Sequence, residues 1–160
     1  MKTTTPHWIA IGVLSTTLLA TGFKFIVMGS TAPANDGRTA VLLEPAERGA
    51  VLGEMRILLE TTQSIIEALA SNDMTTVEKA AHSVGSTAIQ TMDFTLRAKL
   101  PLEFKKLGFA THYAFDDIAD MAKNNRYAQE IQHKLAATMN NCIACHASYQ
   151  LPTKPLPKQR

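Results

Sequence analysis

The sequence predicts an all-α protein: an antiparallel four-helix bundle preceded by an N-terminal transmembrane or signal helix. Apolar residues recur at three- and four-residue spacing in four successive stretches of about 20 to 25 residues, as is typical of amphipathic helices. Short connections between these stretches favour antiparallel neighbours. No stretch alternates as a strand does, and the 160-residue chain, 46% hydrophobic, is long enough for one domain with an appendage.

The first 28 residues predict a membrane anchor or a signal peptide. Lys2 precedes an apolar stretch, residues 8–28, in which Lys24 is the only charge. A signal peptide would use the small residues 32–34 (Ala-Pro-Ala) as its cleavage site. An uncleaved anchor would supply about 20 residues, enough to cross the hydrocarbon core, with Trp8 at one interface and Lys24 reaching the other. We favour the anchor because the apolar stretch is long and ends well before the candidate cleavage site.

The remaining chain divides into three parts. Residues 29–45 predict a linker, because they are rich in small and turn-forming residues and lack helical periodicity. Residues 46–151 form the predicted helical domain. A basic, proline-rich tail, residues 152–160, ends the chain, and we interpret it as a solvated end rather than a docking patch.

Two helices are expected in the first half of the domain. Residues 46–70 carry a regular apolar face, and the polar residues 71–73 end it. Asp73 can cap a second helix over residues 74–92, whose apolar face is built from small side chains and so allows close packing. The first face comprises Val51, Leu52, Met55, Leu58, Leu59, Thr62, Ile65, Ile66 and Leu69, and the second Val77, Ala81, Val84, Ala88 and Met92.

Two further helices are expected in the second half. Pro101 suits the first turn of a third helix that runs to about residue 123, where Asn124 and Asn125 end it. A fourth helix spans about residues 126–149. His112, close to the apolar face of the third helix, is expected to be a hydrogen-bonded or partly exposed residue rather than a metal ligand.

Both cysteines of the chain lie in the run Cys142-Ile143-Ala144-Cys145-His146, at the end of the fourth helix. A Cys-x-x-Cys-His run is typical of covalent c-type haem attachment, in which two thiols add across the haem vinyl groups and the adjacent histidine binds the iron. The three- and four-residue spacing presents all three side chains to one side of a helix. The sequence therefore predicts one haem c, bound through Cys142 and Cys145, with His146 as an axial iron ligand.

Three other interpretations of this run are weaker. A structural zinc site normally has four ligands, and no second cysteine pair exists. A thioredoxin-type redox pair would need alternating strands and helices, which the sequence does not show. A structural disulfide is possible in an exported chain, but two intervening residues within a helix give poor geometry for a stabilising cross-link.

With this motif the helical pattern resembles the class II c-type cytochromes, the cytochrome c prime and cytochrome c-556 group. The resemblance covers about residues 44–151. It is carried by Glu54-Met55-Arg56 in the first helix, Phe115-Asp116 with Ile118 in the third, and residues 139–149 in the fourth. In that family the bundle opens at one end to hold the haem between the first and last helices, and the low-spin members carry an axial methionine in the first helix.

The resemblance implies roles for two residues of the first helix. Met55 occupies the place of the axial methionine, so it is expected to be the sixth iron ligand opposite His146. Methionine is also an ordinary filler of core gaps, and that alternative stays open. Arg56 is expected to pair with a haem propionate, with a solvent-facing arginine as the alternative. Family members often form dimers through the first two helices, so a homodimer is possible here.

These expectations combine into a function: one-electron transfer by a haem with His/Met ligation, outside the cytoplasmic membrane. The domain would face the periplasm, either anchored or released by signal cleavage, and would exchange electrons with membrane or periplasmic redox proteins. No enzyme is expected, because the serines and histidines are dispersed. No nucleic-acid partner is expected, because 16 basic and 14 acidic residues are interspersed. The alternatives are a five-coordinate haem that binds NO or CO, if Met55 does not ligate, and a helical binding module whose cysteine pair is incidental.

Overall fold

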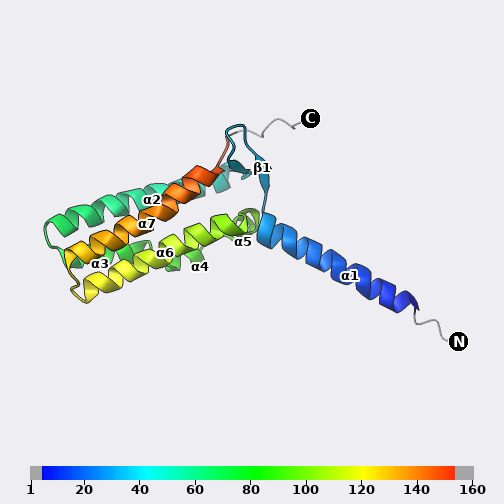
Figure 1. The fold of residues 1–160 in the computed structure, drawn as a ribbon, viewed down its shortest axis with the longest axis horizontal. Coiled ribbons are helices and arrows are strands. Elements are labelled where there is room, and N and C mark those ends of the chain that lie inside the picture. The colour runs from blue at the N-terminus through cyan, green and yellow to red at the C-terminus, as the bar shows by residue number, and fades with distance from the viewer. Residues whose placement is uncertain (1–4, 154–160) are drawn as a thin grey trace.

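The computed structural model describes residues 5–153 and is mostly helical, with an apolar helix at its N-terminus, as predicted (Figure 1). Helix α1 (Thr5–Phe23) and the π-helical turn η1 (Lys24–Met28) form one rod that projects from a body of packed helices. Lys2 and most of the predicted basic tail, residues 154–160, lie outside the described residues.

Four helices make up most of the body: α2 (Pro45–Ala70), α3 (Met74–Ser83), α6 (Leu102–Lys123) and α7 (Ala128–Ser148). α6 packs against both α3 and α7, and α2 packs mainly against α3. Their apolar faces meet in one core. The central side chains of that core are fully buried, and they include residues of the faces predicted from the sequence. The buried members are Ile65, Ala68, Leu69, Val77, Ala81, Val84, Phe115, Ile118, Ala119, Ala122, Ile131 and Leu135.

The predicted starts of α2 and α3 are close to the observed ones, because local capping groups set them. Glu44 and Glu47 form a reciprocal capping box around Pro45 at the start of α2. The Asp73 carboxylate accepts a hydrogen bond from the Thr76 backbone N–H at 3.0 Å and so caps α3, as expected.

The second helix is shorter than predicted. The expectation of one helix over residues 74–92 is wrong: α3 ends at Ser83, and two short helices follow, α4 (Thr87–Gln90) and α5 (Phe94–Lys99). Groups on α6 explain the break. The Asp116 carboxylate accepts a hydrogen bond from the Ser86 N–H at 2.9 Å. Nδ1 of the His112 ring donates a hydrogen bond to the Val84 carbonyl oxygen at 2.8 Å. These hydrogen bonds occupy backbone groups of residues 84 and 86, where the helix would otherwise continue. The expectation that His112 is a hydrogen-bonded residue is confirmed, and its side chain is buried.

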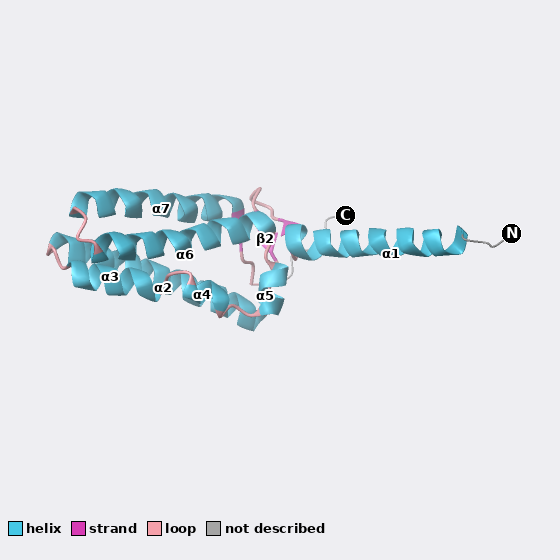
Figure 2. Ribbon diagram, turned by 90° about the horizontal axis from the view of Figure 1, so that it is seen from below, coloured by secondary structure: helices cyan, strands magenta, loops and turns pink. Residues whose placement is uncertain are grey.

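Three short strands are present where the sequence predicted none, so that expectation is wrong. β1 (Thr31–Pro33) pairs antiparallel with β2 (Thr39–Val41), and β2 pairs in parallel with β3 (Tyr149–Gln150), directly after α7 (Figure 2). Strands of two or three residues are too short to show a two-residue period. The predicted linker, residues 29–45, therefore contains two strands, and Ala40 and Val41 within it are fully buried against the body.

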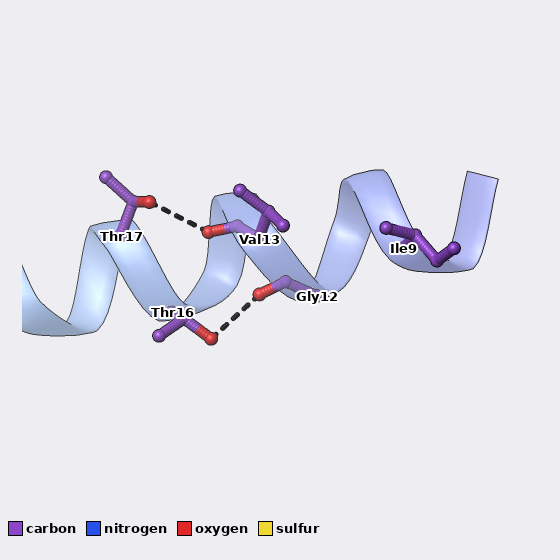
Figure 3. Close-up of a pocket in the computed structure, with 5 residues that line it drawn as sticks. All are labelled: Ile9, Gly12, Val13, Thr16 and Thr17. Carbon is purple, nitrogen blue, oxygen red and sulfur yellow. Dashed lines mark hydrogen bonds between the residues drawn. The ribbon is translucent and has the colours of Figure 1, made fainter. Parts of the chain in front are cut away.

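The N-terminal rod is long and apolar enough over His7–Met28 to be a membrane span or a signal sequence, and its side chains are not buried by the rest of the protein. Four threonines lie within the rod: Thr5, Thr16, Thr17 and Thr21. Thr16 and Thr17 donate their hydroxyls to the carbonyls of Gly12 and Val13, each at 2.9 Å, along a shallow hollow of the helix surface (Figure 3). Their polar groups are thus satisfied within the helix, which is the arrangement that an apolar environment requires.

Candidate functional site

The Cys-x-x-Cys-His run occupies the last turns of α7, as predicted, where the helix leads into β3. Cys142 and His146 are exposed, whereas Cys145 is partly buried. Both cysteines are free thiols. The helical spacing places the exposed thiol and the imidazole one turn apart on the surface of α7, with Cys145 turned toward the body between them.

A cavity of about 160 Å³ lies beside this end of α7. It is the place where the first and last helices of the body come together with the strands. Met55 of α2 and both Cys145 and His146 of α7 line it, so three of the predicted site residues lie around the same cavity. The lining comprises Arg38, Leu52, Met55, Phe104, Cys145, His146, Tyr149, Gln150 and Leu151.

The cavity lining supplies one thiol, Cys145, an imidazole and a thioether, whereas Cys142 lies outside the lining. These are the donor types that a covalently bound haem would use, with Cys142 reaching it from the exposed surface of α7. The volume is smaller than the roughly 300–1,000 Å³ of most ligand pockets. A porphyrin ring therefore requires α2 and α7 to move apart at this end, or to hold the ring with one edge in solvent beside the exposed Cys142 and His146.

The walls of the cavity are apolar and aromatic. The rings of Phe104 and Tyr149 pack edge to face, with centroids 5.3 Å apart. They belong to a second apolar cluster at this end of the body, which also includes Val41 of β2 and the side chains of Met55 and Cys145. Phe94 of α5 and Tyr113 of α6 are not part of this wall, since 79% and 56% of their surfaces are exposed.

Burial shapes the chemistry of the two thiols. It raises the pKa of Cys145 to about 11, with a smaller contribution from the neighbouring Cys142. Burial also raises the pKa of Cys142. Both groups are therefore protonated thiols near neutral pH, and Cys145 is the less reactive nucleophile of the two.

Arg38 is a site residue that the sequence did not indicate. Its Nη1 donates hydrogen bonds to the carbonyl oxygens of His146 and Tyr149, each at 3.2 Å, and its guanidinium pairs with the Asp36 carboxylate at 2.7 Å. That pairing lowers the pKa of Asp36. Because Arg38 lies in the segment expected to be a linker, no periodicity or motif marked it.

A second arginine binds the same stretch of chain. Arg48, at the end of the first turn of α2, donates from Nε to the carbonyl oxygen of Leu151 at 2.9 Å. The two arginines together join the segment that follows the Cys-x-x-Cys-His run to β2 and to α2. Arg56, the arginine predicted to face the haem, is exposed on α2 and does not line the cavity.

Among residues 5–153, no group of three or more histidine, cysteine or carboxylate side chains is arranged to hold a metal ion. Comparison of the chain with protein-family models, with curated proteins and with solved structures finds no match. The features of this chain that bear on its function are therefore the cavity and the motif beside it.

Proposed function

We propose that this protein is a one-electron carrier with a single covalent haem c, built on an antiparallel four-helix bundle of the class II cytochrome type. The observation that carries the proposal is the cavity in which Met55 of α2 meets Cys145 and His146 of α7. Met55 is 90 positions from Cys145 and 91 from His146 in the chain, yet together they supply one of the two thiols and both axial donors that the motif and the resemblance require.

The chain's own residues have distinct roles in this proposal. Cys142 and Cys145 hold the haem, and His146 and Met55 bind the iron. The haem, when bound, supplies the one-electron redox chemistry, and a His/Met pair raises its reduction potential relative to two histidines. The apolar wall around Phe104 excludes water, which disfavours the additional positive charge of the ferric state.

We further propose that the N-terminal segment is retained as a membrane anchor, with the haem domain in the periplasm. The evidence is that β1 is part of the fold. Cleavage after residue 34 would remove β1 from its pairing with β2, and it would remove the hydrogen bond from the Ser30 N–H to the Lys99 carbonyl at 2.7 Å. The partners of such a domain are membrane or periplasmic redox proteins.

The experiment that tests the function uses the full chain expressed with c-type haem maturation machinery. Optical spectra of the oxidised and reduced forms are recorded with and without carbon monoxide. A covalent haem with a low-spin ferrous spectrum that carbon monoxide does not change is the expected result. Met55→Ala should convert it to a high-spin form that binds carbon monoxide, because removing the thioether opens the sixth position.

Met139→Ala is the matched control, because Met139 is an exposed methionine of α7 that does not line the cavity. Its spectrum should equal that of the native chain. An uncoloured protein would refute the proposal of a bound haem and would favour the alternative of a helical binding module. A native spectrum that already shifts with carbon monoxide would remove Met55 as a ligand and make the protein a gas-binding haem protein.

A further inference from the structure

The rod formed by α1 and η1 is fixed to the body rather than tethered to it. Lys105, in the first turn of α6, donates from Nζ to the Ile26 carbonyl of η1 at 2.9 Å. Gly29 ends η1 with φ +63°, and a Cβ at this position would lie 2.7 Å from the backbone nitrogen of Pro101. The corner between α5 and α6 is therefore held against the last turn of the apolar rod.

Three cations belong to the segments that meet at this junction: Lys24 of η1, whose Nζ donates to the Gly29 carbonyl at 2.9 Å, Arg97 of α5 and Lys105 of α6. None of them has a carboxylate within 4.0 Å among the described residues. Other lysines close by are paired, since Lys99 binds Glu47 and Lys106 binds Glu103. The three junction cations thus have no ion-pair partner among the described residues, and Arg97 and Lys105 are close enough for their charges to repel.

Two of these cations are partly removed from water. The Nη2 of Arg97 donates to the Ile89 carbonyl, its guanidinium carbon lies 6.0 Å from the centre of the Phe109 ring, and its Nε is buried without a hydrogen-bond partner. Burial lowers the pKa of Lys105, and the charge of Arg97 lowers it further. A nearby anion would relieve both the repulsion and the lost hydration.

The position of the junction indicates which anion. η1 is the end of the 22-residue apolar segment His7–Met28, and Phe25, Ile26 and Met28 around it are exposed. In a bilayer, this turn lies at the boundary between acyl chains and headgroups, where lysine and arginine contact lipid phosphates. Apolar side chains beside the cations suit the acyl chains of the same lipid, whereas a free phosphate would use only the cations.

We infer that Lys24, Arg97 and Lys105 form a binding site for the headgroup of an anionic membrane lipid, a function that rests on the proposed membrane placement of α1. Such a lipid would fix the orientation of the body on the membrane surface. The end of the body that carries β1 and the C-terminal turn of α7 lies beside this junction (Figure 1). The candidate haem site would then be held near the membrane, within reach of partners embedded in it.

The test uses the full chain in a neutral detergent, mixed with phosphatidylglycerol or with phosphatidylcholine, and counts bound lipids by native mass spectrometry. The native chain should retain phosphatidylglycerol in preference to phosphatidylcholine. Lys105→Gln should reduce phosphatidylglycerol binding about fivefold, the effect of one charge near a membrane surface, and Lys105→Arg should keep it. Lys123→Gln, at the opposite end of the same helix, should leave binding unchanged, and circular dichroism checks that all variants keep their helices.

The outcomes separate the two proposals. Equal binding of both lipids, or no effect of Lys105→Gln, overturns the lipid site. If an equal concentration of inorganic phosphate displaces phosphatidylglycerol, the site binds free phosphate, and the proposal that it is specific for a lipid is refuted. Extraction of membranes from expressing cells with alkaline carbonate tests the placement itself: a chain released by this treatment overturns both the anchor and the lipid site.

Discussion

Replacement of Arg38 by alanine tests whether the end of α7 is held by the segment before α2. Arg38 donates hydrogen bonds to the carbonyls of His146 and Tyr149, the residues that end the Cys-x-x-Cys-His run and begin β3. In Arg38→Ala these two carbonyls lose their side-chain donor. Arg38 directly precedes Thr39, which pairs with Tyr149 in the parallel ladder of β2 and β3. The substitution therefore removes a side chain that supports this pairing from its edge.

The expected magnitude follows from these contacts. Both hydrogen bonds are 3.2 Å long, and one of them is exposed to solvent, so each is worth about 0.5–1 kcal/mol. The ion pair with Asp36 is exposed and contributes little. The free energy of unfolding should therefore fall by about 1–2 kcal/mol, which corresponds to a decrease in Tm of roughly 5–10 °C for a helical body of this size.

Thermal unfolding of the full haem-free chain in detergent, followed by circular dichroism, measures this change. Arg56→Ala is the matched control, because it removes the same charge from an exposed position on α2 near the same end of the body. It should change Tm by less than about 2 °C, as most exposed substitutions do. Equal effects of the two variants, or an Arg38→Ala Tm equal to that of the native chain, would refute the role assigned to Arg38.

Two other predictions concern the thiols and the helix break. In the haem-free native chain, alkylation of Cys145 by iodoacetamide at pH 8, followed by peptide mass spectrometry, should be about a hundredfold slower than for a free thiol, because the pKa of Cys145 is raised from 9.0 to about 11. The rate should rise with pH up to about 11, and a plateau below pH 9 would contradict the burial of this thiol. Gly85→Ala should lower the free energy of unfolding by about 1–3 kcal/mol in urea, because the new Cβ would lie 2.7 Å from the Asp116 Cγ and displace the carboxylate from the Ser86 N–H. Gly108→Ala, in the middle of α6 with no atom within 4 Å of the added Cβ, should be neutral or stabilising by up to about 1 kcal/mol, and an equal loss in both variants would contradict the steric explanation.

Much of the helical architecture was predictable because its signals are local. Amphipathic periodicity depends on residues within a few turns, and it gave α2, α6 and α7 to within two residues at either end. The polar residues 71–73 and 124–125, which end α2 and α6, are likewise a signal that involves only a few consecutive residues. The Cys-x-x-Cys-His run is local too, since its five consecutive residues need only a helix to present their side chains together. Its binding of haem stays a prediction.

Features that depend on distant partners were missed or predicted incorrectly. The break after α3 comes from Asp116 and His112, which are 30 and 28 residues away from the backbone groups that they bind. The pairing of β2 with β3 and the contacts of Arg38 join residues more than 100 positions apart. Strands this short have little propensity of their own, and tertiary contacts supply the free energy that keeps them in place.

The sequence by itself determined that the protein is helical, that an apolar helix begins it, and that two thiols and an imidazole share one turn near its end. Only the tertiary structure decided that Met55 lies in the same cavity as Cys145 and His146, that Arg38 rather than Arg56 lines that cavity, and that the apolar rod is fixed to the corner of α5 and α6. The physical reason is the range of the interactions. Periodicity and capping act within a few residues of the chain, whereas a binding site is created by side chains that become neighbours only when the helices pack.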